Sequence, residues 1–219
     1  MLETIEIETA PEPNAAIIWM HGLGADGHDF EPVVPELVRR GERAWRFVFP
    51  NAPVRPVSIN NGMSMRAWYD ILGFARGTAE DAAGFSATDM EVGALIGREL
   101  ERGIAAGRLV LAGFSQGGAV TLYTGLRYPR RLAGLMVLSS YLPMRQTLPR
   151  EHAPANDGVP IFMAHGIDDP VLPMAMGLES RDLLKAQGYD VEWHQYRMPH
   201  SVSEAEIADI RQFLFRVLP

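Results

Sequence analysis

The chain has 219 residues, 47% of them hydrophobic and 21% charged, which is typical of a globular protein with a sizeable core. A formal net charge of −7 at pH 7, with no run of Lys or Arg, argues against nucleic acid or an anionic membrane surface as the main partner. The absence of cysteine excludes disulfides, thiol catalysis and Cys-based metal sites.

The N-terminus does not have the pattern of a targeting segment. Residues 1–10 are acidic and alternating, without the basic start and apolar core of a signal peptide. No apolar run approaches the length of a membrane span. We therefore expect a cytoplasmic protein without an integral membrane segment.

Apolar runs bounded by Gly and Pro predict strands and helices that alternate along the chain. Strands are predicted at 2–8, 15–20, 46–49, 109–112, 132–140, 159–164 and 190–196. Helices are predicted at 30–40, from Thr88 or Asp89 to Arg102, after residue 115, at 174–187, and from a cap at Ser201 or Ser203 to the C-terminus. Segments 50–62 and 141–158 are predicted to be loops. This alternation predicts one α/β domain over 1–219, with a mainly parallel sheet flanked by helices and no separate cap domain.

Residues 63–77 are unusually apolar for a connecting segment, with Trp68, Tyr69 and Phe74 among them. Two interpretations stay open from the residues alone. The segment packs on the core, or part of it forms the wall of a binding pocket.

A G-x-S-x-G pattern, Gly113-Phe-Ser-Gln-Gly117, follows the strand predicted at 109–112 and precedes a helix. In this context the serine becomes a nucleophile, held at a crowded turn where side chains two residues away would clash. The alternative is a strand-to-helix turn whose glycines serve packing only. A base, an acid and an oxyanion site elsewhere in the chain decide between the two.

Four predicted strands end in distinctive loops, at 21–27, 113–117, 165–169 and 197–200, which a parallel sheet places on one edge. The order Ser115, then Asp168 or Asp169, then His200 is the order of the Ser-Asp-His triad in α/β hydrolases. In that arrangement His200 takes the serine proton and a carboxylate orients the imidazole. Spacing alone does not choose between the two aspartates.

The oxyanion of the tetrahedral intermediate needs two backbone N–H donors. Gln116 follows the nucleophile and supplies one amide, and Leu23, in the glycine-rich loop after the strand at 15–20, supplies the other. His21 and His165 begin strand-end loops, but they come too early in the triad order. We interpret both as positioning groups.

Five motifs in register resemble the phospholipase/carboxylesterase family, the small cap-less α/β hydrolases that include bacterial carboxylesterases and acyl-protein thioesterases. They are His21-Gly-Leu-Gly-Ala-Asp-Gly27, Met65-Arg-Ala-Trp-Tyr-Asp-Ile71, Gly113-Phe-Ser-Gln-Gly-Gly118, His165-Gly-Ile-Asp-Asp-Pro170 and Pro199-His200. The resemblance implies Ser115 as nucleophile, His200 as base and Asp169 as acid, with the amides of Leu23 and Gln116 as the oxyanion hole. It also implies an acyl groove lined by Met63, Trp68, Val171 and Leu172.

The sequence thus predicts a serine carboxylesterase that hydrolyses short- to medium-chain esters through an acyl-enzyme, with no cofactor and no metal site. An alternative is a lysophospholipase or acyl-protein thioesterase with the same triad. A remote alternative is a hydrolase-like binding protein without catalysis. We expect a small-molecule ester or acyl substrate, and the resemblance suggests a homodimer.

Overall fold

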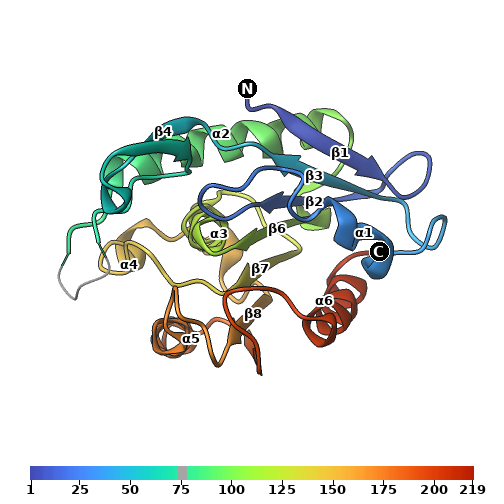
Figure 1. Ribbon diagram of the computed structural model, residues 1–219. Helices are drawn as coiled ribbons and strands as arrows, with labels where there is room; N and C mark the ends of the chain where they lie inside the picture. Colours follow the sequence, from blue (N-terminus) through green and yellow to red (C-terminus); the bar gives the residue numbers. More distant parts are fainter. Residues whose placement is uncertain (74–77) are drawn as a thin grey trace.

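The structure is a computed structural model that describes residues 1–73 and 78–219. Its main sheet runs in the order β1-β3-β2-β6-β7-β8-β9, seven strands among the described residues (Figure 1). β1 pairs antiparallel with β3, and every other neighbouring pair is parallel. The strands are Thr4–Glu8 (β1), Ala15–Met20 (β2), Trp45–Pro50 (β3), Leu109–Phe114 (β6), Gly134–Leu138 (β7), Ile161–Gly166 (β8) and Val191–Tyr196 (β9).

The central strands are apolar throughout because helices cover both faces of the sheet. α2 (Ala82–Glu101), α3 (Gln116–Arg127) and α5 (Met174–Ala186) contribute side chains to the core on one face. α1 (Val34–Leu37) and α6 (Glu204–Val217) contribute to the core on the other face (Figure 1). Neighbouring residues of β2 alternate between these two cores, as Ile17 and Ile18 do. This is the α/β-hydrolase arrangement, and no cap domain is inserted between the described elements.

The parallel strands bring the predicted loops to one edge of the sheet. β2 ends at Met20, β6 at Phe114, β8 at Gly166 and β9 at Tyr196, so the loops that follow all start from the carboxyl edge. The prediction that these loops share one edge is confirmed. Across the described ranges, no helix is both long enough and apolar enough to span a membrane.

The segment predicted as a loop at 50–62 contains regular structure, so that prediction was wrong in part. β4 (Val54–Val57) pairs antiparallel with β5 (Met63–Arg66) across the 3-10 turn Ser58–Asn60. Pro56 suggested a loop, but this ribbon has only two strands and each is an edge, where a missing N–H is tolerated. Segment 141–158 likewise holds two single turns, Leu148–Glu151 (α4) and Pro154–Asn156, which are too short to show periodicity.

Two helices have bounds in the structure that differ from the predicted bounds. The helix expected at 30–40 is only the 3-10 turn Glu31–Val33 followed by α1, because Val38 is already extended at φ −144°. α2 begins at Ala82 and not after Thr88 or Asp89. Asp81 caps α2 by accepting the Gly84 N–H at 2.9 Å, while the Thr88 hydroxyl donates to the Trp68 carbonyl. Residues 74–77 of the apolar segment lie outside the described residues.

α6 begins with a capping box, which settles the choice of cap in favour of Ser203. The Ser203 Oγ accepts the Glu206 N–H at 3.3 Å, and the Glu206 carboxylate accepts the Ser203 N–H at 3.4 Å. Glu206 is fully buried and its Oε1 has no hydrogen-bond partner among the described residues. Burial raises the pKa of Glu206 to about 8.

We predict that Glu206 makes the protein less stable as the pH rises from about 4.5 to about 8. Over that interval the unfolded chain releases the carboxyl proton while the folded protein retains it, so the free energy of unfolding falls. Glu206→Gln keeps a cap acceptor and removes this titration. The variant should therefore gain stability over the wild type by a few kcal/mol more at pH 8 than at pH 5, measured by urea unfolding. Glu204→Gln, which changes an exposed charge in the same turn, is the matched control.

Candidate active site

Ser115 stands at the turn between β6 and α3 with φ 53° and ψ −116°, a backbone conformation that non-glycine residues rarely adopt. The neighbouring chain forces this turn. A Cβ at Gly113 would overlap the backbone of Gly117, and a Cβ at Gly117 would overlap the Met20 carbonyl oxygen. The expected clash two residues from the serine is therefore present on both sides. The Ser115 hydroxyl makes no hydrogen bond to any described residue, so it is free to turn toward a substrate or a base.

His200 and Asp169 meet beside this turn. The His200 Nδ1 lies 2.6 Å from the Asp169 Oδ2, and the side chain of Asp169 is fully shielded from solvent. Its Oδ1 accepts the N–H groups of Val171 and Leu172, each at 2.9 Å. Asp168, which the spacing could not distinguish from Asp169, is exposed. The structure thus brings Asp169, and not Asp168, to His200.

The charge of Asp169 determines which ring nitrogen of His200 carries the proton. Burial raises the pKa of Asp169, but hydrogen bonds from His200, Leu172 and Val171 outweigh it and hold the pKa below its usual value. The carboxylate is therefore ionised at neutral pH and accepts the Nδ1–H of His200. The opposite ring nitrogen, Nε2, is then the basic one, and it makes no hydrogen bond to any residue that the structure describes. The ring of Phe114 packs against the His200 imidazole, with centroids 4.7 Å apart.

His165 contacts the loop that carries Asp169 and Leu172. Its Nε2 donates to the Leu172 carbonyl at 2.8 Å and lies 3.5 Å from the Asp169 Oδ2. Burial lowers the pKa of His165, so the ring is neutral and Nε2 carries its proton. His165 therefore ties together the loop that carries Asp169 and Leu172, as a positioning group does.

The two predicted oxyanion amides have no acceptor within the described structure. The Gln116 N–H is the first of α3, so it has no partner inside the helix. The Leu23 N–H, in the loop after β2, donates to no described residue, whereas its neighbour Gly24 donates to the Arg66 carbonyl at 2.9 Å. Two free amides beside a serine are the groups that an oxyanion needs.

His21 and Trp68 hold the loop that carries Leu23. The His21 Nε2 accepts the Ala52 N–H at 3.1 Å, so its proton is on Nδ1, which donates to the Gly22 carbonyl at 2.6 Å. Burial lowers the pKa of His21 and keeps the ring neutral. The indole Nε1 of Trp68 donates to the His21 carbonyl at 2.9 Å. His21 is thus a positioning group for this loop.

The Gln116 side chain, for which the sequence offered no role, clamps the segment that follows β5. Its Oε1 accepts the Trp68 N–H at 2.8 Å, and its Nε2 donates to the Tyr69 carbonyl at 2.7 Å. Both of these hydrogen bonds are buried. Trp68 also donates to the His21 carbonyl, two residues before Leu23. The segments that carry the free amides of Gln116 and Leu23 are therefore connected through Trp68. A long-range contact of this kind leaves no signal in the sequence.

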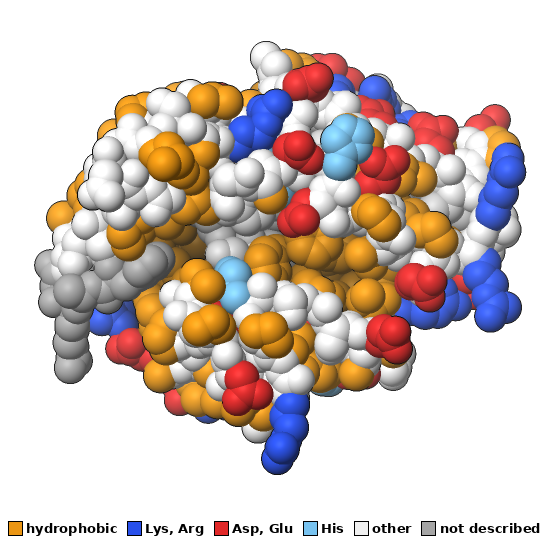
Figure 2. All heavy atoms as spheres, in the orientation of Figure 1, with side chains coloured by type: hydrophobic (Ala, Val, Ile, Leu, Met, Phe, Trp, Pro, Cys, Tyr) orange, Lys and Arg blue, Asp and Glu red, His pale blue; other side chains and the backbone are white. Residues whose placement is uncertain are grey.

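A cavity of about 170 Å³ opens next to Ser115. Its lining is mostly apolar and consists of Leu23, Ile59, Asn60, Tyr69, Ile71, Ser115, Gln116, Tyr141, Val171 and Leu172. Hydrophobic side chains gather around a hollow on the face shown in Figure 2. Of the predicted groove residues, Val171 and Leu172 lie in this lining.

The other two predicted groove residues lie elsewhere. Trp68 is fully buried in the core beneath the cavity, and Met63 is 65% exposed on the β4–β5 ribbon. Ile59 and Tyr141 are lining residues that the sequence did not indicate, whereas Tyr69 and Ile71 belong to segment 63–77, for which a place in a pocket wall was left open. Aromatic and apolar residues of a connecting segment look alike whether they face the core or a pocket, so only the structure separates them.

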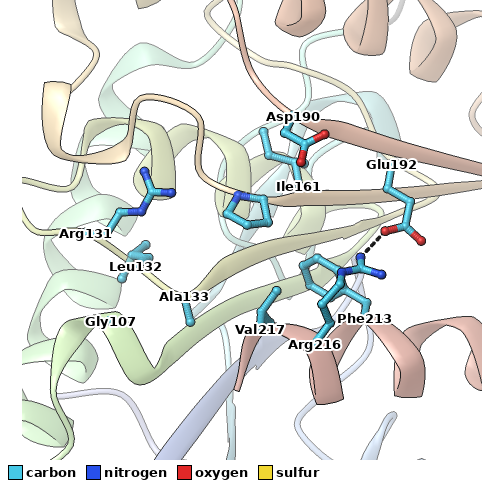
Figure 3. Close-up of a pocket in the computed structure, with 11 residues that line it drawn as sticks. Gly107, Arg131, Leu132, Ala133, Ile161, Asp190, Glu192, Phe213, Arg216 and Val217 are labelled. Atoms are coloured by element: carbon cyan, nitrogen blue, oxygen red, sulfur yellow. Dashed lines mark hydrogen bonds and ion pairs between the residues drawn. The ribbon is translucent and has the colours of Figure 1, made fainter. Parts of the chain in front are cut away.

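A larger hollow of about 560 Å³ lies at the opposite edge of the sheet, where β7, β8 and β9 begin (Figure 3). Three of its charged side chains, Arg131, Glu192 and Arg216, are already engaged. Arg216 pairs with Glu192, and Arg131 donates to the carbonyls of Asp157 and Gly158. No serine or histidine is among its lining residues. Ser115 and the free amides of Leu23 and Gln116 belong instead to the smaller cavity.

The fold and this edge define an α/β hydrolase. A serine at a strained turn, an ionised carboxylate on a histidine and two unpaired amides together can carry out acyl transfer. The phospholipase/carboxylesterase family model matches residues 3–218, and the chain belongs to this family of hydrolases.

The relatives agree with this assignment. Acyl-protein thioesterase 1 of Mycosarcoma maydis is 38% identical over all of this chain and 98% of the relative. Acyl-protein thioesterase 1 of Neurospora crassa is 41% identical, over 94% of this chain and 87% of the relative. The crystal structure of Zea mays acyl-protein thioesterase 2 superposes with a TM-score of 0.87 at 28% identity and covers all of both chains. The chain is thus similar to acyl-protein thioesterases along its whole length.

We predict that Gln116→Ala lowers kcat/KM for p-nitrophenyl butyrate by about tenfold or more, although it leaves the backbone amide in place. Loss of the clamp frees Trp68, and misplacement of catalytic groups by a fraction of an ångström has effects of this size. The check is steady-state kinetics together with the melting temperature, since a folded variant with reduced kcat separates positioning from unfolding. Gln187→Ala, at an exposed position after α5, is the matched control. A Gln116→Ala enzyme as active as this control would contradict the prediction.

Proposed function

We propose that the protein hydrolyses acyl thioesters and carboxylic esters through an acyl-enzyme on Ser115, with His200 as general base and Asp169 as the acid of the triad. The observations that support this most directly are the 2.6 Å contact between Asp169 and His200, whose ring packs on Phe114 next to Ser115, and the mostly apolar cavity that Ser115 lines. The ionised Asp169 leaves the His200 Nε2 free to accept a proton.

Acylation follows from the positions of these groups. The hydroxyl of Ser115 attacks the substrate carbonyl while His200 takes its proton, and the C–O⁻ of the tetrahedral intermediate is stabilised by the amides of Leu23 and Gln116. Collapse of the intermediate breaks the bond to the alcohol or thiol, which receives the proton from His200. The acyl group remains bonded to Ser115 Oγ.

Deacylation repeats the same steps with water as the nucleophile. His200 takes a proton from water, the hydroxide attacks the acyl-serine, and the oxyanion forms again between Leu23 and Gln116. Release of the carboxylic acid returns the proton to Ser115. Each proton passes through the His200 Nε2, and Asp169 stabilises the imidazolium without accepting a proton.

We propose an S-acylated protein or peptide as the preferred substrate class. The relatives named acyl-protein thioesterase support this choice, and so does the absence of a cap over the described part of the site. A site without a cap admits an acyl group attached to a large leaving group. Ile59 and Val171, at the cavity, are 40% and 54% exposed and offer an apolar surface beside it.

We predict that Ser115→Ala lowers hydrolysis of both an S-acyl cysteine peptide and p-nitrophenyl butyrate by at least about 10³-fold, because it removes the nucleophile. Ser86→Ala, at an exposed position on α2, should retain full activity. Free thiol and p-nitrophenolate release measure the two reactions. A fluorophosphonate probe should label the wild type and Ser86→Ala but not Ser115→Ala. Labelling or turnover that survives in Ser115→Ala would disprove the nucleophile assignment.

The second candidate is a carboxylesterase for short acyl groups, and the volume of the cavity favours it. At about 170 Å³ the cavity is smaller than the 300–1,000 Å³ of pockets that enclose drug-sized ligands. A short chain fits within this volume, whereas a long chain has to extend past Ile59 or Val171 onto the surface.

We predict an optimum at short to medium acyl length, with kcat/KM falling by about tenfold or more for the longest chains. Thioesters and oxygen esters with matched acyl groups from two to sixteen carbons test this, measured below their critical micelle concentrations. A thioester-to-ester ratio well above the ratio of their uncatalysed rates supports the thioesterase. Activity that increases steadily to the longest chain would contradict the limit set by the cavity.

A further inference from the structure

Two tyrosines that line the mostly apolar cavity beside Ser115 bring their hydroxyl groups together. The hydroxyl oxygens of Tyr69 and Tyr141 are 3.0 Å apart, which is a hydrogen bond. Most of the lining around them is aliphatic, from Leu23, Ile59, Ile71, Val171 and Leu172. A pocket of this kind takes its specificity from the few polar groups placed in it.

A count of donors shows that one O–H group of the pair is left over. Each hydroxyl has one hydrogen to donate, and the bond between them uses one of the two, whichever tyrosine is the donor. The described residues provide no hydrogen-bond acceptor for the second O–H. Burial raises the pKa of Tyr69 well above its ordinary value and that of Tyr141 to about 12, so both are protonated donors near neutral pH.

The pair is held in place from both sides. The Tyr69 ring stacks on Phe85 at a centroid distance of 4.0 Å, and its carbonyl accepts from Gln116. Next to Tyr141, the Ser140 Oγ donates to the Ser115 carbonyl at 2.6 Å and the Leu142 N–H donates to the Ser180 Oγ at 2.8 Å. A donor fixed in this way loses little conformational freedom when it binds an acceptor.

The cavity is placed to hold the acyl part of a substrate. The leaving group has to lie next to His200, which protonates it, and His200 does not line the cavity. Leu23, Ser115 and Gln116, which surround the reacting carbonyl, do line it. The chain on the other side of that carbonyl therefore extends toward Tyr69 and Tyr141.

We propose that the Tyr69–Tyr141 pair is a specificity determinant that selects acyl groups carrying a hydrogen-bond acceptor, such as a keto oxygen, over plain alkyl chains. An alkyl chain in the cavity displaces water from the spare O–H but has no acceptor for it. A keto oxygen accepts a hydrogen bond from this O–H. This inference rests on the proposed acyl hydrolysis and specifies the substrate class of the same site.

The experiment compares hexanoyl with 3-, 4- and 5-oxohexanoyl thioesters of N-acetylcysteamine. The full-length wild type, Tyr141→Phe and Tyr69→Phe are assayed, with Tyr128→Phe as the control because Tyr128 lies outside the cavity lining. The readout is the kcat/KM of each oxo substrate divided by that of hexanoyl. Comparison of this ratio between variant and wild type cancels the intrinsic reactivity of each thioester.

For at least one oxo position, the ratio should fall by about tenfold or more in Tyr141→Phe or in Tyr69→Phe, whichever removes the hydroxyl that the oxo group binds, while Tyr128→Phe keeps the wild-type ratio. Either variant still leaves one O–H without an acceptor, so neither should hydrolyse the hexanoyl thioester much faster than the wild type does. A variant that only disturbs the structure would lower kcat/KM for all of the substrates together.

Ratios that match the wild type in both Tyr141→Phe and Tyr69→Phe would overturn the inference. That result leaves the proposed function standing as long as hexanoyl is hydrolysed in a Ser115-dependent way. If Ser115→Ala hydrolyses hexanoyl as fast as the wild type does, the proposed function itself has failed, and the two failures are thus distinguished.

Discussion

The backbone of Ser115, at φ 53°, is the constraint on which the site depends. A serine in this conformation is strained, and the strain persists because the surroundings leave no alternative. Gly113 and Gly117 are in direct backbone contact, and the Met20 carbonyl occupies the space where a side chain of Gly117 would be. The close approach of β2, β6 and α3 therefore sets the direction of the hydroxyl and of the first amide of α3 at once.

The proposed oxyanion site joins residues far apart in the sequence through a single tryptophan. The Gln116 side chain holds the Trp68 N–H, and the Trp68 indole holds the His21 carbonyl two residues before Leu23. Two amides that must converge on one oxygen are thus fixed relative to each other and not only to their own loops. Preorganised donors of this kind need no rearrangement when charge develops. This explains why a core tryptophan belongs to the chemistry although it does not line the cavity.

The sequence predicted the parts of the fold that are encoded locally. Apolar strands and the glycines of the turn depend on residues near one another in the chain, and the fold class and the common edge of the loops were right. Contacts between distant segments were not predictable. Met63 and Trp68 were expected in the groove, but pairing with β4 exposes Met63 and the contacts with His21 and Gln116 bury Trp68. The start of α2 was misplaced because Asp81, a good cap, is recognised only once its bonds to Gly84 and Asp70 are seen.

Asp169 connects the proposed triad to the cavity wall. One carboxylate oxygen faces His200, and the other accepts the amides of Val171 and Leu172, whose side chains line the cavity. His165 adds to this connection by donating to the Leu172 carbonyl. At positions 171 and 172 these bonds use only backbone N–H and C=O groups, so they do not depend on which side chains stand there. The acyl pocket can therefore change shape through those two side chains while the acid stays aligned with the base, which separates substrate selection from catalytic geometry within four consecutive residues.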